Sequence, residues 1–281
     1  MGGVERAVGD APRAAMLLTR ILPAGRIGGR RAALIVERNA FVYRRTWLVL
    51  VSGFFEPLFY LLSVGLGVGA IIETIPGPGG RELPYALFVA PALLAASSMN
   101  GAIFESTYNV FGKIHFEKTY DAILATPVGV GDIALGEITW ALIRGGLYTI
   151  GFLVVMVVMG LATSPWLLLA LPAAALVGFA FAATAMAATT YMKTWQDFDR
   201  IQMVLLPMFL FSGTFYPVEA YPEALRLIVG VTPLYQGVTL IRALAIGAVE
   251  PGLLVNVAYL VVMGLVGLVI VARRLNHLLA K

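Results

Sequence analysis

The stretch YNVFGKIHFEKTYDAILATPVGVGDIALG, residues 108–136, is a long polar-mixed interruption between strongly apolar segments. Inside it, Thr119 is suited to cap a short helix that runs from Tyr120 to Ala125. Pro127 ends that helix, because proline has no N–H and disfavours helical backbone in the residue before it. The pattern therefore predicts a helical stub with polar residues at its N-terminal end.

A stub this short, placed between two membrane spans, cannot bury a core of its own. Its apolar residues Ile123 and Leu124 therefore need a partner surface. Two roles fit the pattern. The stub is either a docking helix for a soluble motor protein or a loop that lies on lipid headgroups.

Composition decides the class of protein. The chain has 281 residues, of which 59% are hydrophobic and 13% charged, and its mean hydropathy is +0.87. An ordinary soluble domain is about 45–50% apolar and about 25% charged. The chain is therefore expected to be an all-α integral membrane protein whose main partner is the lipid bilayer. It contains no cysteine, so disulfides, thiolate metal sites and cysteine nucleophiles are excluded.

The N-terminal part divides into two segments. Residues 1–29 hold scattered arginines among Ala and Gly and read as a cytoplasmic segment. Residues 30–45, RRAALIVERNAFVYRR, place Leu34, Ile35, Phe41 and Val42 on one helical face between bracketing arginines. This pattern predicts an amphipathic helix on the cytoplasmic membrane surface. The alternative is a helix packed on the rest of the protein.

Six segments are long enough to cross a hydrocarbon layer, which needs about 20 helical residues. Together they form a transmembrane domain over residues 46–272, followed by a cytoplasmic tail at 273–281. Between the fifth and sixth spans, residues 218–250 contain two apolar pieces too short to cross, which predicts external re-entrant helices. The predicted spans are 46–72, 85–107, 137–160, 166–190, 200–217 and 251–272.

The distribution of positive charge sets the orientation. Of the 20 Lys and Arg residues, only Arg81, Arg226 and Arg242 lie in segments predicted to be external, and Arg144 lies inside a span. Cytoplasmic loops carry the excess of Lys and Arg. Both termini and the 108–136 loop are therefore predicted to be cytoplasmic. The net charge of +4 reflects this bias, and no nucleic-acid partner is expected.

Six spans with no internal repeat are few helices to enclose a pathway through the bilayer, so dimerisation is expected. Small residues in the fourth span, among them Ala173, Gly178 and Ala183, permit close helix contacts. These contacts lie either at a dimer seam or within one copy.

Charged residues inside spans are costly. Glu56 lies inside the first span and precedes Pro57, which weakens the adjacent helical turn. Glu56 either lines a pathway and acts at a hinge, or holds the bundle together through a hydrogen bond. Glu105, Glu137 and Arg144 are predicted to form a charge cluster at the cytoplasmic rim, with a mainly structural role.

Several kinds of chemistry are missing from the sequence. Gly112-Lys113 is followed by Ile114 and lacks the earlier glycine of a phosphate-binding loop. His115 and His277 are isolated, with no partner at metal-ligand spacing. Neither an H-E-x-x-H nor a G-x-S-x-G motif lies within a span. The chain is therefore expected to be no enzyme and to bind no nucleotide, cofactor or metal itself.

Three segments carry a resemblance to a known family. They are EPLFYLLSVGLGVG at 56–69, the stretch from FVAP to ITWA at 88–141, and FLFSGTFYPVEAYPEALRLIVGVTPLYQGVTLIRAL at 209–244. They resemble the permease subunits of ABC-2 type ATP-binding-cassette exporters, in the NodJ-like lipooligosaccharide-export and daunorubicin-resistance branch. The most specific parts are F-E-x-T-Y-x-x-F, then T-Y-D-A-I-L-A-T-P, and F-S-G with a later T-P-L.

The resemblance implies a bacterial plasma-membrane permease that forms a homodimer, or a heterodimer with a paralogue. It implies separate cytoplasmic ATPase subunits that hold ATP and Mg²⁺, and a contact seam between first and fifth spans of opposite copies. A coupling helix that fits a cleft in the ATPase falls on residues 118–127. The coupling residues implied are Lys118, Thr119, Tyr120, Asp121, Ile123 and Leu124.

The substrate is expected to be amphiphilic, such as a drug, a glycolipid or a lipooligosaccharide. Aromatic faces accept both apolar and cationic groups. Such side chains either line a pathway or face lipid. The pathway candidates are Phe55, Glu56, Phe59, Tyr60, Phe209 and Phe211.

Two other function classes compete with export. A membrane scaffold would bind a cytoplasmic partner and move nothing. An ATP-independent channel is disfavoured because no filter-like ring of residues is evident.

Overall fold

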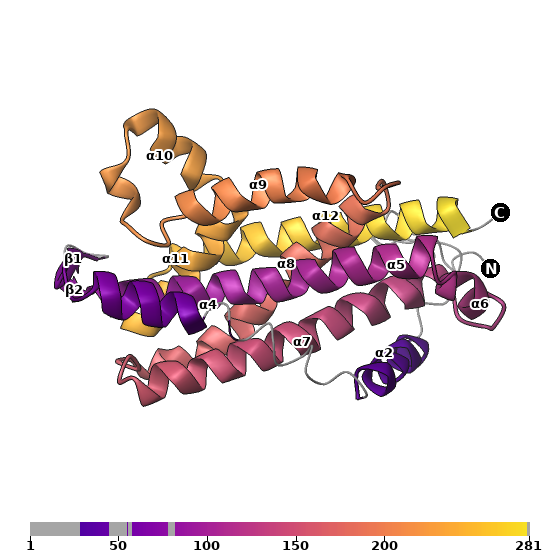
Figure 1. The fold of residues 1–281 in the computed structure, drawn as a ribbon, viewed down its shortest axis with the longest axis horizontal. Coiled ribbons are helices and arrows are strands. Elements are labelled where there is room, and N and C mark those ends of the chain that lie inside the picture. The colour runs from indigo at the N-terminus through magenta and orange to yellow at the C-terminus, as the bar shows by residue number, and fades with distance from the viewer. Residues whose placement is uncertain (1–28, 45–54, 56–57, 78–81, 280–281) are drawn as a thin grey trace, which may run out of the picture.

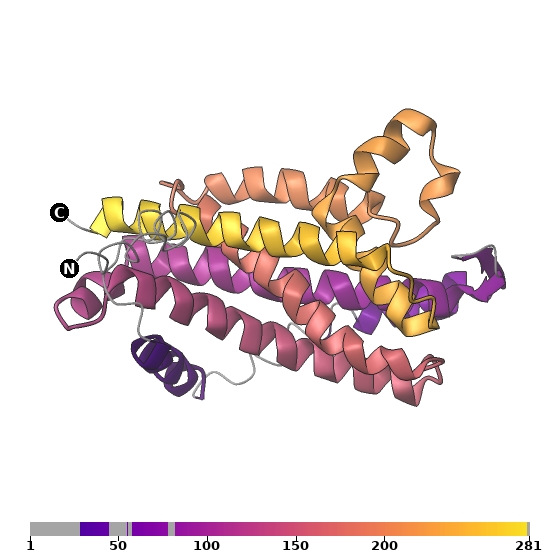
Figure 2. The ribbon, with the colours of Figure 1, turned by 180° about the vertical axis from the view of Figure 1, so that it is seen from behind.

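The computed structural model describes residues 29–44, 55, 58–77 and 82–279, and every element named below lies in these ranges. Most of this part is helical, and the long helices run side by side as one bundle (Figures 1 and 2). In chain order, the elements are α2 (Gly29–Tyr43), η1 (Leu61–Val68), β1 (Thr74–Pro76), β2 (Glu82–Pro84), α4 (Tyr85–Phe104), η3 (Glu105–Asn109), α5 (Val110–His115), α6 (Thr119–Leu124), α7 (Val130–Val158), η4 (Pro165–Leu169), α8 (Ala170–Thr189), α9 (Asp197–Phe211), η5 (Val218–Ala220), α10 (Glu223–Gly230), α11 (Pro233–Ile246) and α12 (Leu253–Leu279).

Four continuous helices are long and apolar enough to cross a membrane. They cover Tyr85–His115, Val130–Val158, Pro165–Thr189 and Leu253–Leu279. These match four of the spans that the sequence predicts, and they confirm a mainly helical multi-pass membrane protein. The end of the bundle with α5, α6 and the end of α12 lies opposite the end with the strands and α10 (Figure 1).

The remaining spans stay a prediction. The described part of segment 46–72 includes the shorter apolar helix Leu58–Val68. In segment 200–217 the helix α9 has 15 residues, fewer than the roughly 20 that a full crossing needs. The two apolar pieces of 218–250 form α10 and α11, which meet at a bend of 82°. The helices themselves match the sequence pattern, whereas their entry into the membrane from outside stays a prediction.

One element was not foreseen. β1 and β2 form a short antiparallel pair in which Thr74 lies opposite Pro84 and Ile75 opposite Leu83. The pair lies just before α4, at the end of the bundle away from α6 (Figure 1).

Helix α4 lies at the centre of the bundle. In the most apolar stretch of Tyr85–His115, 89% of residues are buried, compared with 28% in Leu253–Leu279. Helix α4 packs against α7, α8 and α11. It therefore supplies a shared core, while α12 keeps a large apolar surface exposed.

The small residues of α8 serve packing within one copy. An added side-chain carbon at Gly264 of α12 would lie 2.3 Å from a ring atom of Phe179. At Gly267 the same carbon would lie 2.7 Å from the backbone of Ala183. Ala173, Ala182 and Ala183 are buried in the core. Contact inside the chain is therefore one use of this stripe, and it lets α8 and α12 approach closely. A dimer seam stays a prediction.

This contact generates a prediction. Gly267→Ala should destabilise the protein by about 1–3 kcal/mol, because the new methyl group meets backbone atoms that cannot move aside. Gly146→Ala in α7 is the matched control, since its added carbon meets nothing within 4 Å. Thermal unfolding in detergent measures both. Equal stability of the two variants would contradict the close α8–α12 contact.

Candidate functional site

Helix α6 is the stub that the sequence predicts, but its start differs in detail. Lys118 occupies the N-cap position in the left-handed region, at φ 49°, and no side chain caps the helix. The Thr119 hydroxyl instead donates to Oε2 of Glu117 at 3.0 Å. The prediction that Thr119 caps the helix is therefore wrong. The end is as expected, because the helix stops at Leu124, shortly before Pro127.

The two sides of α6 differ sharply. Tyr120 is 1% exposed, and Ile123 and Leu124 are half-buried against the main core. The partner surface that these apolar residues need is thus supplied by the chain itself. Lys118 and Asp121 are exposed. Of the six coupling residues that the resemblance implies, Tyr120 is the one that is fully buried, so it positions the stub, while Lys118 and Asp121 face outward.

Burial also affects the chemistry of Tyr120. Desolvation of the ring hydroxyl, together with the nearby negative charge of Glu137, raises the pKa of Tyr120 well above its ordinary value. The side chain therefore stays neutral throughout the physiological range and acts as an apolar anchor between α6 and the bundle.

Helix α2 lies against α7 and the loop after α6. Ile35 packs so close to Gly136 that an added carbon there would lie 2.5 Å from Cβ of Ile35. Nη1 of Arg31 donates to the carbonyl oxygen of Pro127 at 2.6 Å. The loop that carries α6 is therefore tied to α2 at its far end.

The amphipathic face of α2 is divided differently from the sequence prediction. Ile35 is 3% exposed and contacts protein, whereas Leu34, Phe41 and Val42 remain exposed. The four residues therefore do not share one environment. The helix packs on the protein along one side and keeps apolar side chains exposed on another. Residues are therefore available both for packing on the rest of the protein and for contact with the membrane surface.

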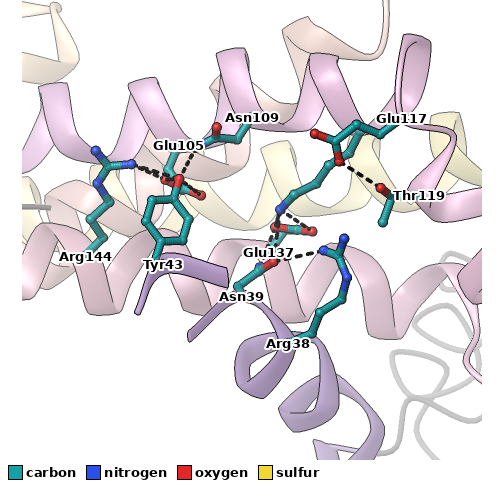
Figure 3. A network of polar contacts seen from close by, with 10 residues as sticks. Arg38, Asn39, Tyr43, Glu105, Asn109, Glu117, Thr119, Glu137 and Arg144 are labelled. Carbon is teal, nitrogen blue, oxygen red and sulfur yellow. Dashed lines mark hydrogen bonds and ion pairs between the residues drawn. The ribbon is translucent and has the colours of Figure 1, made fainter. Parts of the chain in front are cut away.

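A buried ion pair joins α2, α5 and α7. Nζ of Lys113 lies 2.7 Å from Oε2 of Glu137, and both residues are buried. Nδ2 of Asn39 donates to the same carboxylate at 2.9 Å, and Lys113 donates to Oδ1 of Asn39 at 3.2 Å. Arg38 also donates to Oδ1 of Asn39 (Figure 3). Each charge is thus paired and hydrogen-bonded, as burial demands.

A second buried ion pair lies two helical turns further along α7. Arg144 pairs with Glu105, and the Tyr43 hydroxyl donates to Oε2 of Glu105 at 3.0 Å. Nδ2 of Asn109 donates to the Tyr43 hydroxyl at 2.6 Å (Figure 3). Nε of Arg144 donates to the Tyr148 hydroxyl at 2.8 Å. Burial, and after it the charge of Glu105, raises the pKa of Tyr43.

The rim cluster is therefore two networks rather than one. The structure brings Glu105 and Arg144 together, as predicted, but Glu137 pairs with Lys113. The sequence reasoning missed Asn39, Tyr43 and Lys113. The available signal was the polar pair Asn39 and Tyr43, four residues apart on α2, which lie on one helical face.

An aromatic cluster links α5 to the start of α9. Phe111, Met192 and Phe198 are buried together, with Tyr108 packed against them. The rings of Tyr108 and Phe198 stack with centroids 4.2 Å apart. Nε2 of His115 lies 3.1 Å from the carbonyl oxygen of Met192. The end of α5, directly before α6, is therefore packed on the segment that leads into α9.

Two of the pathway candidates meet across elements. The ring of Tyr60, just before η1, lies edge-on to Phe209 of α9 with centroids 5.7 Å apart. Phe55 and Phe59 stack on each other at 5.9 Å and are exposed. Phe211 is partly exposed. Glu56, the sixth candidate, lies outside the described residues.

No group of three or more His, Cys, Asp or Glu residues that could hold a metal ion occurs in the ranges that the structure describes. The charged groups of the site are used in pairing between helices. The arrangement therefore holds α2, α5, α7 and the helix that runs on from α4 together.

The buried pair generates a prediction. Lys113→Met should destabilise the protein by about 3–5 kcal/mol, because it leaves Glu137 buried without its cation. The double variant Lys113→Met, Glu137→Leu should recover most of the loss, since no charge then remains to be paired. As a control, Arg200→Ala breaks the exposed pair with Asp197 and should change stability little. Thermal unfolding in detergent distinguishes these cases. A double variant as unstable as the single one would contradict the explanation.

Comparisons with known proteins agree with this architecture. The profile of the ABC-2 type transporter family matches residues 31–246. Nodulation protein J of Rhizobium meliloti (strain 1021) is 33% identical over 214 residues, which cover 75% of this chain and 80% of the relative. Nodulation protein J of Rhizobium leguminosarum bv. viciae is 31% identical over 260 residues, 90% of this chain and 97% of the relative. The family match covers well over half of the chain and includes most of α2, both buried ion pairs and α6, so this protein belongs to the ABC-2 type transporter family.

Proposed function

We propose that the chain is the permease half of an exporter that moves an amphiphilic molecule outward by alternating access. Separate ATPase subunits, which hold ATP and Mg²⁺, bind to α6 and supply the energy. The absence of a phosphate-binding loop in the sequence supports this division of labour. Membership of the ABC-2 type transporter family supports the association with such subunits.

The observation that carries the proposal is how α6 is mounted. Its inner side is anchored by the buried ring of Tyr120, while Lys118 and Asp121 are exposed. The loop after it is held to α2 by the bond from Arg31 to Pro127. A protein that presses on the exposed side therefore pushes a clamped element rather than a loose loop.

The buried networks connect the α6 end to other helices and so transmit the movement of α6 to them. Asn39, Lys113 and Glu137 join α2, α5 and α7, so these elements move together when α6 is displaced. The stacked rings of Tyr108 and Phe198 connect the same end to α9. Movement at α6 thereby reaches the helix that the resemblance places at the seam between copies.

Two copies, or this chain and a paralogue, form the pathway. Met203, Val204 and Leu206 of α9 are highly exposed apolar residues, which suits a face covered by another copy or by lipid. Phe59, Tyr60, Phe209 and Phe211 lie in or near the first and fifth predicted spans. An aromatic pathway of this kind accepts an amphiphile such as a drug, a glycolipid or a lipooligosaccharide.

The protein lies in the bacterial plasma membrane with the α6 end and both termini in the cytoplasm. The excess of Lys and Arg in the corresponding segments supports this orientation. The end with the strands and α10 then faces outward.

The docking role is tested by reversing one charge. Asp121→Lys should uncouple transport from ATP hydrolysis and weaken ATPase binding, because it changes the exposed side of α6 without touching the core. Asp199→Lys in α9 is the control, since it makes the same charge change at another exposed residue. Co-purification with the ATPase and substrate uptake by inverted vesicles provide the two readouts. Normal binding and uptake by Asp121→Lys would refute docking at α6.

The pathway is tested at the aromatic residues. Phe59→Ala and Phe211→Ala should alter drug resistance or lipid export at normal protein levels, since each removes an exposed ring. Val158→Ala on α7, an exposed apolar residue outside the proposed seam, is the control. If all three variants transport alike, the aromatic pathway is excluded.

A further inference from the structure

A cavity of about 1120 Å³ lies at the end of the bundle opposite α6. The two strands, the segment after α9, α11 and the start of α12 line it. Ligand pockets for small molecules are typically about 300–1,000 Å³. The cavity is therefore large enough for the polar part of an amphiphile. It lies within one copy and involves none of the seam residues discussed above.

Among the described residues that line it, one buried cation lies at the inner wall. Arg242 of α11 lines the cavity and is 6% exposed. Its Nε donates to the carbonyl oxygen of Phe88 at 3.0 Å, and its Nη2 donates to that of Gly213 at 2.7 Å. The guanidinium carbon lies 3.7 Å from the centre of the Phe88 ring. The side chain is thus fixed in position from α4 and from the segment after α9.

The fixed arginine has no ion-pair contact among the described residues, and Glu219 at the rim of the cavity acts on its charge only from a distance. Within the described ranges no carboxylate forms an ion pair with Arg242, and Nη1 makes no hydrogen bond. A guanidinium has five N–H donors, and only two are used here. A buried charge without a partner is costly. An anion in the cavity would supply a direct ion-pair partner and acceptors for the unused donors.

The loop that holds Arg242 explains part of a sequence motif. Gly213 has φ +70°, a left-handed conformation that glycine adopts without strain. The hydroxyls of Ser212 and Thr214 lie 2.7 Å apart and are buried on either side of it. The residues F-S-G-T thus form a turn that directs a carbonyl oxygen to the guanidinium. From the sequence alone, Arg242 is recognisable only as a positive charge in a segment predicted to be external.

The rim of the cavity carries negative charge, in contrast to the positive charge at its inner wall. Glu219 and Glu250 line it and are exposed. Their charges are screened by water, whereas the charge of Arg242 is not. Carboxylates accept hydrogen bonds from hydroxyl or ammonium groups. The cavity is therefore complementary to a headgroup with an inner anionic group and an outer hydroxylated or cationic part.

We infer that this cavity binds the phosphate-like anionic group of an amphiphile, with Arg242 as the anion ligand and Glu219 and Glu250 contacting the outer part of the headgroup. The inference deepens the proposed function by naming the chemistry of the transported or regulating lipid. Binding itself requires neither the ATPase nor transport.

The test measures binding to the full chain, purified in an uncharged detergent and a phosphate-free buffer. The probes are dihexanoylphosphatidylglycerol, inorganic phosphate and octyl glucoside. The anionic lipid should bind and raise the unfolding temperature, whereas the glucoside should do neither. Equal binding of phosphate alone would keep the anion site and assign it to a free anion. Equal binding of the lipid and the glucoside would overturn the inference.

Variants locate the binding. Arg242→Gln should weaken lipid binding about a hundredfold, as expected for losing one partner of a buried charge pair. Ala220→Trp fills the exposed rim without touching the arginine, so it tests the cavity even if Arg242→Gln does not fold. Arg273→Gln, an exposed charge-matched change on α12, should bind normally.

The outcomes separate this inference from the export function. Unchanged lipid binding by Ala220→Trp and by folded Arg242→Gln would refute the anion site while leaving coupling at α6 intact. Conversely, specific binding by a chain that recruits no ATPase would refute export and leave the anion site standing.

Discussion

The ion pair between Lys113 and Glu137 constrains the whole α6 end of the molecule. Both residues are buried, so neither charge can be left without the other. A buried pair adds little net stability compared with apolar residues, but separating its members is costly. Its effect is to fix register. Lys113 is on α5, Glu137 is on α7, and Asn39 on α2 bonds to both, so the loop between α5 and α7 has one arrangement. The exposed side of α6 is presented by that arrangement.

The helix that leads into this site departs from ideal geometry where the site requires it. Residues Glu105–Asn109 form a π-helical turn between α4 and α5. A wider turn contains an extra residue and redirects the side chains, and such turns are frequent at functional sites. Here the turn contains Glu105, which reaches Arg144 and Tyr43, and Asn109, which reaches Tyr43. The irregular turn and the buried polar network are therefore explained together, because the hydrogen bonds and the ion pair of the network offset the free-energy cost of the turn.

The sequence predicts those features that depend on local pattern. Apolar length identified four spans, and proline placement identified the end of α6. Features that depend on contacts between residues far apart in the sequence could not be predicted from these local patterns. Asn39 and Glu137 are 98 residues apart, and Arg242 and Phe88 are 154 residues apart. Composition shows that a charge inside a membrane protein needs a partner, but it does not show which partner. The sequence pattern therefore groups Glu105, Glu137 and Arg144 in one cluster and indicates no ion-pair partner for Lys113. The cap at Thr119 failed for a local reason: the helix begins one residue earlier than predicted, so Thr119 is its first helical residue and Lys118 holds the N-cap position.

The two ends of the bundle share one central element. The continuous helix Tyr85–His115 contains Phe88, whose carbonyl oxygen and ring hold Arg242, and it contains Glu105 and Lys113, which belong to the two ion pairs. The most apolar stretch between these points is almost wholly buried, so it is surrounded by packed side chains that resist compression. Pro91 and the π-helical turn are the places where this helix departs from regular hydrogen bonding. The two departures therefore lie toward opposite ends of the helix, with Pro91 close in sequence to Phe88 and the π-helical turn beginning at Glu105, and the packed stretch lies between them.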